Sequence, residues 1–262
     1  MDTHGRVALV TGSATGIGAA SALKFAQRGL DVVINYSKSA KEAEESRAAC
    51  EAEGVKAIAV QADVSQDSDC RKLAKAALDA FGRIDVLVNN AGGTKFADHA
   101  DLDALDAEDF QRLYAVNVVG PYQMIRACAP AMKAQGRGAV VNVSSIAGVA
   151  GIGSSVAYAA TKGALNTMTL SLARALAPEI RINAVCPGFV GTRWFRDRFG
   201  EEGFQSLVQH MQNTTPLQTA GTPELVADSV VFMGLEGAEH ITGETLLTDA
   251  GLHLSMTPLT AR

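Results

Sequence analysis

Long apolar runs, paired cysteines and an excess of positive charge are all missing from this 262-residue sequence. No apolar run approaches the roughly 20 residues that a membrane-spanning helix needs. The 23 lysines and arginines are outnumbered by 28 aspartates and glutamates, and the net charge of −5 gives no electrostatic reason to bind nucleic acid or an anionic membrane. The first residues lead straight into the short apolar run 7–10 without the pattern of a signal peptide.

The cysteines are few and lie far apart in the sequence. They form no C-x-x-C pair, which argues against both a metal site and a disulfide framework. We therefore expect no bound metal, reduced thiols and a cytoplasmic location. Cys186 falls at the end of an apolar run, where we expect a buried strand residue. The four cysteines are Cys50, Cys70, Cys128 and Cys186.

What the sequence does contain is a regular alternation of short apolar runs and longer segments with helical spacing. Hydrophobic residues make up 47% of the chain and charged residues 19%, as in a packed globular protein. The predicted strands are Val7–Thr11, Asp31–Tyr36, Val55–Gln61, Ile84–Asn89, Ala139–Ser144, Ile180–Cys186 and Glu244–Thr248. The predicted helical segments include Ala19–Gly29, Lys41–Gly54, Ser68–Phe81, Ala107–Gln135 and Val156–Leu176.

This alternation predicts a parallel sheet with right-handed helical crossovers. The strands are almost wholly apolar, as expected when helices cover both faces of the sheet. Glycines at 29, 54 and 82 fall where helices commonly end. No linker or low-complexity stretch interrupts the chain, so we expect one α/β doubly wound, Rossmann-type domain over residues 1–262.

A glycine-rich loop follows the first predicted strand. It reads Thr11-Gly12-Ser13-Ala14-Thr15-Gly16-Ile17-Gly18 and leads into a helix. Glycines allow the backbone to approach a ligand closely, and the helix N-terminus offers free N–H groups that suit a pyrophosphate. The spacing G-x-x-x-G-x-G differs from the commonest dinucleotide fingerprint, G-x-G-x-x-G. By itself such a loop could also be a tight turn.

The loop resembles that of the short-chain dehydrogenase/reductase family, in the single-domain branch that contains 3-oxoacyl reductases and glucose dehydrogenases. The resemblance covers essentially the whole chain. It implies a seven-stranded parallel sheet, an NAD(P) cofactor and hydride transfer between that cofactor and a carbonyl or alcohol substrate. The motifs that carry it are residues 11–18, Asn89-Asn90-Ala91-Gly92, Asn117, the set Ser145, Tyr158 and Lys162, Pro187-Gly188, and Ile241-Thr242-Gly243.

Tyr158 and Lys162 stand four residues apart in a predicted helix, which places them on one face. A tyrosine with its ordinary pKa near 10 is a poor base at neutral pH, but a nearby ammonium group lowers that pKa. The pair is therefore a candidate general acid/base. An ordinary half-buried tyrosine beside a surface lysine would show the same spacing.

Ser144 and Ser145 both end an apolar strand, where ligands bind in open α/β sheets. The resemblance selects Ser145, thirteen residues before the tyrosine, as the hydroxyl that binds the reacting oxygen. It also implies that Asn117 holds a water that links Lys162 to solvent. From the sequence alone, Asn117 could equally be a polar residue that faces solvent.

The resemblance distributes the cofactor contacts over several strand ends. Asp63 would approach the adenine, although an aspartate there could also cap a helix. The remaining contacts come from the segment beyond the sixth strand, which binds the nicotinamide. In full, the predicted cofactor-binding residues are Gly12, Ser13, Thr15, Gly16, Ile17, Gly18, Tyr36, Ser37, Lys38, Asp63, Val64, Asn89, Ala91, Gly92, Tyr158, Lys162, Pro187, Gly188, Val190 and Thr192.

The end of the second strand favours NADP(H) over NAD(H). An acidic residue at that place binds the ribose hydroxyls of NAD and repels a 2′-phosphate. Here Tyr36 stands in its place, and Ser37 and Lys38 can bind a phosphate. Many NADP-dependent relatives carry a basic residue before the second glycine of the loop, where this chain has Thr15, so use of NAD(H) stays open.

Three alternative functions were considered. An epimerase of the extended branch is disfavoured, because such enzymes have a larger segment beyond the position of Pro187. A catalytically silent dinucleotide sensor is also disfavoured, because it would lack part of the Asn117, Ser145, Tyr158 and Lys162 set. A 3-oxoacyl thioester reductase fits the motifs, although residues 93–96 depart from its usual pattern. The resemblance also implies a homotetramer, a small-molecule carbonyl or alcohol substrate, and a substrate lid at about 193–212.

Overall fold

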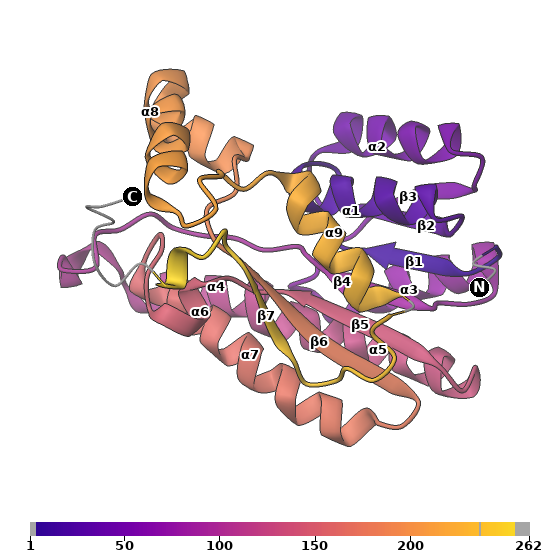
Figure 1. Ribbon diagram of the computed structural model, residues 1–262. Helices are drawn as coiled ribbons and strands as arrows, with labels where there is room; N and C mark the ends of the chain where they lie inside the picture. Colours follow the sequence, from indigo (N-terminus) through magenta and orange to yellow (C-terminus); the bar gives the residue numbers. More distant parts are fainter. Residues whose placement is uncertain (1–3, 236, 255–262) are drawn as a thin grey trace.

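The computed structural model describes residues 4–235 and 237–254 of the chain. Its seven strands form one parallel sheet in the order β3-β2-β1-β4-β5-β6-β7 (Figure 1). This is the doubly wound, Rossmann-type architecture that the alternating pattern predicts. The strands are β1 Val7–Val10, β2 Asp31–Tyr36, β3 Ala57–Gln61, β4 Val86–Asn89, β5 Gly138–Val143, β6 Ile180–Pro187 and β7 Thr245–Thr248.

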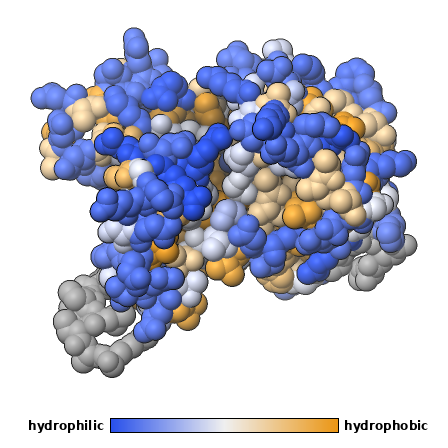
Figure 2. Space-filling view, turned by 90° about the horizontal axis from the view of Figure 1, so that it is seen from above, coloured by the Kyte–Doolittle hydropathy of each residue, from blue (hydrophilic) through white to orange (hydrophobic). Residues whose placement is uncertain are grey.

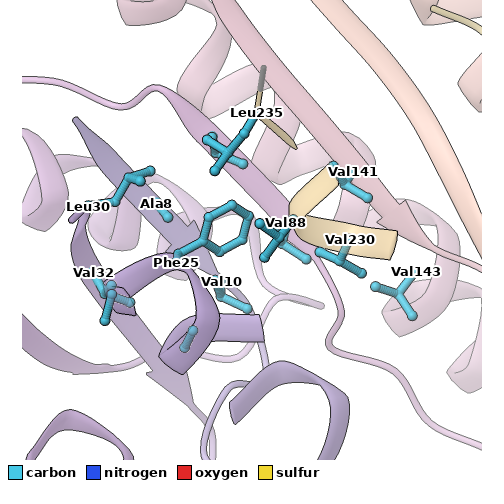
Figure 3. Packing of buried hydrophobic residues seen from close by; sticks show 14 of the residues in the cluster. Ala8, Val10, Phe25, Leu30, Val32, Val88, Val141, Val143, Val230 and Leu235 are labelled. Carbon is cyan, nitrogen blue, oxygen red and sulfur yellow. The ribbon is translucent and has the colours of Figure 1, made fainter. Parts of the chain in front are cut away.

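One face of the sheet is covered by α1 (Gly16–Gln27), α2 (Ala40–Ala52) and α9 (Pro223–Gly234). Alternate residues of each strand point to this face, as the two-residue period of a strand requires. Phe25 of α1 is fully buried and lies among Ala8, Val10 and Val88 in Figure 3. Burial of such a ring contributes about 2–3 kcal/mol to folding.

The opposite face is covered by α3 (Asp67–Phe81), α5 (Gly120–Ala134) and α7 (Val156–Leu176). The other alternate residues of β1, Val7 and Leu9, are fully buried here. Both faces of β1 are therefore covered, which explains why the strand carries no polar residue. The sheet is held between two apolar layers, and the loops at the strand ends remain free to form a site.

The predicted helix ends agree with the structure, whereas one predicted long helix is interrupted. The expected glycines end their helices in the left-handed region, with φ of +82° at Gly29, +87° at Gly54 and +73° at Gly82. The segment predicted as one helix over 107–135 is instead divided into α4 (Ala107–Tyr114), a π-helical turn (Ala115–Val119) and α5. The remaining short helix is α6 (Ala147–Ala150) and the lid segment is α8 (Arg193–Thr214).

Helix α9 was not among the predicted elements. Its start signal is nevertheless present in the sequence: Thr222 accepts a hydrogen bond from the Leu225 amide at 3.4 Å, and Pro223 occupies the first helical position. A threonine cap followed by proline is a typical helix beginning. The apolar residues of α9 pack on the same sheet face as α1.

Candidate active site

A cleft of about 1250 Å³ opens at the carboxyl ends of the strands β1 to β6. Figure 2 views the molecule from above and shows hydrophilic side chains on its flanks and hydrophobic ones in the hollow between them. The cleft wall includes the glycine loop, the loops after five further strands, and the start of α8. This is where ligands bind in open α/β sheets.

The glycine loop packs closely against the chain that follows β4 and leads into α1. Gly12 has φ +60°, and a Cβ there would lie 2.8 Å from Ala91 Cα. Gly16 has φ +59° and begins α1, whose N-cap Thr15 makes no side-chain hydrogen bond to the first turn. The amide groups of that turn can therefore bind an anion such as a pyrophosphate.

Some of the predicted loop residues line the cleft, and others hold the loop in position. Gly12, Thr15, Gly16 and Ile17 line the cleft, whereas Ser13 and Gly18 do not. The buried Ser13 hydroxyl donates to Val10 O at 2.7 Å and accepts from the Asn35 amide at 2.9 Å. At Gly18 a Cβ would lie 2.4 Å from Gly12 O. Ser13 and Gly18 therefore hold the loop instead of facing a ligand.

Asn35 was missed by the sequence prediction and joins three strand ends. Its Oδ1 accepts from the Gly12 amide at 3.0 Å, and its Nδ2 donates to Ala62 O at 3.0 Å. The signal was available, because an asparagine inside the buried run 32–36 needs internal partners. Asn35 also lines the cleft, where it sets the position of the glycine loop.

Another part of the cleft wall is formed by Tyr36, Ser37, Lys38, Asp63 and Val64. Their contacts with a cofactor stay a prediction. Asp63 Oδ1 accepts from the Ser65 amide at 2.9 Å. It therefore forms a local turn as well as part of the cleft wall.

At the end of β4, Asn90 lines the cleft in place of the predicted Asn89. Asn89 is only 2% exposed, does not line the cleft, and donates to Asn142 Oδ1 at 2.9 Å. Asn90 lines the cleft and donates from Nδ2 to Thr11 O and Gly12 O, both at 3.0 Å. The prediction for Asn89 is therefore corrected, because it lies in the strand while the chain beyond it turns into the cleft.

Ser145, Tyr158 and Lys162 meet at the middle of the same cleft. Ser155 caps α7 by accepting from the Tyr158 amide at 3.2 Å, which fixes the first turn that carries the tyrosine. Lys162 Nζ donates to Val143 O at 2.8 Å and lies 5.6 Å from the centre of the Tyr158 ring. The expected shared face of the helix is confirmed.

The two neighbouring serines have different partners. The Ser144 hydroxyl donates to Lys162 O at 3.2 Å, toward the backbone of α7. Ser145 hydrogen-bonds with the Tyr158 side chain, and its Oγ accepts from the Ala147 amide at 3.1 Å. Ser145 is thus the serine that contacts the tyrosine hydroxyl.

Burial sets the proton affinities of this group. It raises the pKa of Tyr158 to about 12, against a smaller lowering by the hydrogen bond with Ser145. Burial also lowers the pKa of Lys162 to about 8. The expectation that the lysine lowers the tyrosine pKa is therefore not met in this state, because desolvation is the larger effect. Tyr158 is a neutral phenol at pH 7.

Asn117 lies in the π-helical turn and is 1% exposed, so it is not a solvent-facing residue. Its Oδ1 accepts from the Gly93 amide at 2.8 Å, and its Nδ2 donates to Gly93 O at 2.9 Å and to Thr161 Oγ1 at 3.0 Å. A Cβ on Gly92 would lie 3.2 Å from Asn117 Oδ1 and 3.9 Å from Lys162 Nζ. The side chain fixes the loop that lies beside the lysine.

The wall beyond β6 is formed by Pro187, Gly188, Val190 and Thr192, all of which line the cleft. Their contacts with the nicotinamide stay a prediction. At Gly188 a Cβ would lie 2.7 Å from the Asp249 Cβ, so the close backbone approach requires glycine. Cys186, just before this segment, is fully buried in β6 as expected.

Helix α8 and its aromatic side chains close the remaining side of the cleft. The helix is broken at Gly200, where φ is +68°. Phe96 makes edge contacts with Phe195 and Phe199 at centroid distances of 6.2 and 5.9 Å. All three rings line the cleft, whereas Phe204 is the buried residue of the helix.

Other kinds of site find little support in the described part of the chain. There, no three His, Cys, Asp or Glu side chains gather in a group that could hold a metal ion. The four cysteines have buried, unpaired thiols. Among the described helices, none combines the length and apolar character needed to cross a membrane.

The fold and the cleft define a class of protein: a Rossmann-type oxidoreductase whose glycine loop and tyrosine–lysine pair share one cleft. A family described as enoyl-(acyl carrier protein) reductase matches residues 12–253. The chain is 42% identical to a protein named as a candidate ketoacyl reductase 2 of the granaticin polyketide synthase of Streptomyces violaceoruber, over 95% of this chain and 96% of that protein.

Two further comparisons cover nearly the whole chain. The L-rhamnose 1-dehydrogenase (NAD(P)(+)) of a Sphingomonas species is 38% identical over 97% of this chain and 98% of that protein. A crystal structure of a candidate short-chain dehydrogenase/reductase from Burkholderia xenovorans matches with a TM-score of 0.88 and 40% identity, over 95% and 98% of the two chains. The protein belongs to the short-chain dehydrogenase/reductase family and is an NAD(P)-dependent oxidoreductase.

Proposed function

We propose that the protein reduces a ketone to a secondary alcohol with NADP(H), with Tyr158 as the general acid. The observation that carries this proposal is the position of Ser145, Tyr158 and Lys162 on the wall of the cleft that also holds the glycine loop. The first turn of α1, which begins at the cleft-lining Gly16 and has no side-chain cap, fits the pyrophosphate of a dinucleotide. The bound nicotinamide would supply the hydride.

The residues of the cleft divide the remaining work. Ser145 binds the carbonyl oxygen, and Tyr158 donates its phenolic proton to that oxygen as the carbon is reduced. Burial raises the pKa of Tyr158 to about 12, so the phenol carries this proton at neutral pH. Lys162 stabilises the phenolate that remains, since a nearby ammonium favours an anion.

The substrate enters beside α8, which we propose as a lid over residues 193–212. Its rings at 195 and 199 meet Phe96 across the cleft and would exclude water from the reacting carbonyl. A 3-oxoacyl thioester is an alternative substrate, because the Streptomyces relative is named a ketoacyl reductase. The proposal for the cofactor does not depend on that choice.

We infer a preference for NADP(H) from the end of β2. Tyr36, Ser37 and Lys38 line the cleft where a dinucleotide ribose would lie, and none of them is acidic. Ser37 and Lys38 can bind a 2′-phosphate through a hydroxyl and a positive charge.

Replacement of Tyr36 tests the proposed function and the cofactor preference together. We expect wild-type enzyme to reduce members of a ketone panel faster with NADPH, and Tyr36→Asp to shift the kcat/KM ratio toward NADH by about tenfold or more, because like charges repel. Tyr36→Asn is the matched control, which removes the ring without adding charge. A wild type that favours NADH tenfold would contradict the preference, and failure with every ketone would contradict the function.

A further inference from the structure

Arg198 is a cleft-lining residue that the proposed reaction does not use. It lies in α8, next to the break at Gly200. The carbon at the centre of its guanidinium lies 5.9 Å from the ring centroid of Phe96 and 5.8 Å from that of Phe199. Two aromatic rings thus orient the cation without neutralising it.

The other two arginines that line the cleft, Arg112 and Arg193, form ion pairs with acidic side chains. Arg112 donates to Asp109 Oδ1 at 2.9 Å, and Asp109 also binds Lys95, so that these two cations lower its pKa to about 2. Arg193 pairs with Glu42 at 3.2 Å. Arg198 has no ion pair within the described residues.

The charges on the wall suit a ligand with a single negative charge. Asp98 is the acidic residue that lines this end of the cleft among the described residues, and its Oδ1 accepts from the Ala100 amide at 2.9 Å. The Asp98 carboxylate would repel a doubly charged phosphate, and the Arg198 guanidinium alone would balance only one of the two negative charges. A carboxylate matches the guanidinium in charge and geometry.

We propose that the substrates of this site are ketones with a flat apolar body and one carboxylate, and that Arg198 recognises the carboxylate. The apolar body lies against the wall formed by Phe96, Phe195 and Phe199. This inference rests on the proposed function, because it assigns the substrate class of the same cleft. Arg198 acts here in binding and specificity, and takes no part in proton transfer.

Trp194 provides a binding signal that does not depend on turnover. It is the single tryptophan of the chain, lines the same cleft and is 44% exposed. We would titrate the aryl keto acid benzoylpropionate and its neutral primary amide, and follow tryptophan fluorescence with and without NADP⁺. The oxidised cofactor cannot reduce the ketone, so binding is measured alone.

We expect wild-type protein to bind the keto acid roughly five- to tenfold more tightly than the amide, as one charge-assisted hydrogen-bonded pair at a partly exposed site provides. Arg198→Gln should bring the two affinities together and leave that for the amide unchanged. Arg196→Gln is the matched control, because Arg196 stacks on Phe204 at 4.3 Å and does not line the cleft. That variant should keep the wild-type preference.

Equal affinities in the wild type, a preserved preference in Arg198→Gln, or no response to either probe would overturn the assignment. A separate assay of NADPH oxidation with the amide distinguishes the proposed ketone reduction from the proposed role of Arg198. A charge preference in binding without any ketone reduction would leave Arg198 as an anion-binding residue and reject the proposed reaction. Reduction of the amide without a charge preference would reject only the role of Arg198.

Discussion

Lys162 shows at the scale of one residue how function opposes stability. The residue is 5% exposed, and its ammonium donates a hydrogen bond to Val143 O at 2.8 Å. Removing a charge from water costs free energy that a single hydrogen bond does not offset. The lowered pKa, about 8 instead of 10.5, expresses that cost.

We predict that Lys162→Met raises the free energy of unfolding by about 1–3 kcal/mol at pH 7 while activity is lost, because the methionine fills the site without a charge. Below pH 8 the lysine is protonated in both the folded and the unfolded chain, so the cost is complete. Between pH 8 and 10.5 the folded protein releases the proton first and the cost declines. The advantage of the variant should therefore shrink over this window in urea unfolding experiments.

Lys75→Met serves as the control, because Lys75 is 73% exposed and pairs with Asp79 on the surface. It should change stability by only a few tenths of a kcal/mol and show no such pH window. A Lys162→Met protein less stable than the wild type at pH 7 would contradict the assigned cost.

At the scale of the secondary-structure element, the sequence was sufficient to predict strands and helices wherever the apolar residues follow one clear pattern. Runs such as 32–34 are buried on both faces, so an apolar strand could be predicted directly, and Gly82 marked the end of α3. The π-helical turn at Asn117 could not be predicted, because its surroundings keep helical spacing on both sides. What ties Asn117 to Gly93 is a tertiary contact between residues far apart in the sequence.

The candidate site shows the same division. Motif positions predicted the glycine loop, Ser145, Tyr158 and Lys162 as parts of one site, and these three side chains line the same cleft as Gly12, Thr15, Gly16 and Ile17 of the loop. The motif at the end of β4 did not predict which asparagine would line the cleft: Asn90 lines it and Asn89 is buried in the strand. The direction of the tyrosine pKa was also missed, since burial cannot be counted from spacing alone.

For the whole molecule, we predict a homotetramer with D₂ symmetry. Several large apolar side chains on α4, α5 and α7 are exposed, among them Tyr114, Tyr122 and Leu170 at 43%, 44% and 52%. These helices and the segment 248–254 are the expected interfaces. Light scattering should give about four times the 27.3 kDa chain mass at micromolar concentration. A species of one chain mass alone would contradict this, and Leu170→Glu should weaken the assembly.

The central claim is that Tyr158 supplies the proton for carbonyl reduction, and Tyr158→Phe tests it most directly. The phenyl ring preserves the packing at the start of α7 and removes only the hydroxyl that contacts Ser145. With a ketone that the wild type reduces, kcat should fall by about 10²–10⁴-fold, while the Kd for NADPH stays within about twofold. A variant that keeps more than about a third of the wild-type kcat would contradict the account.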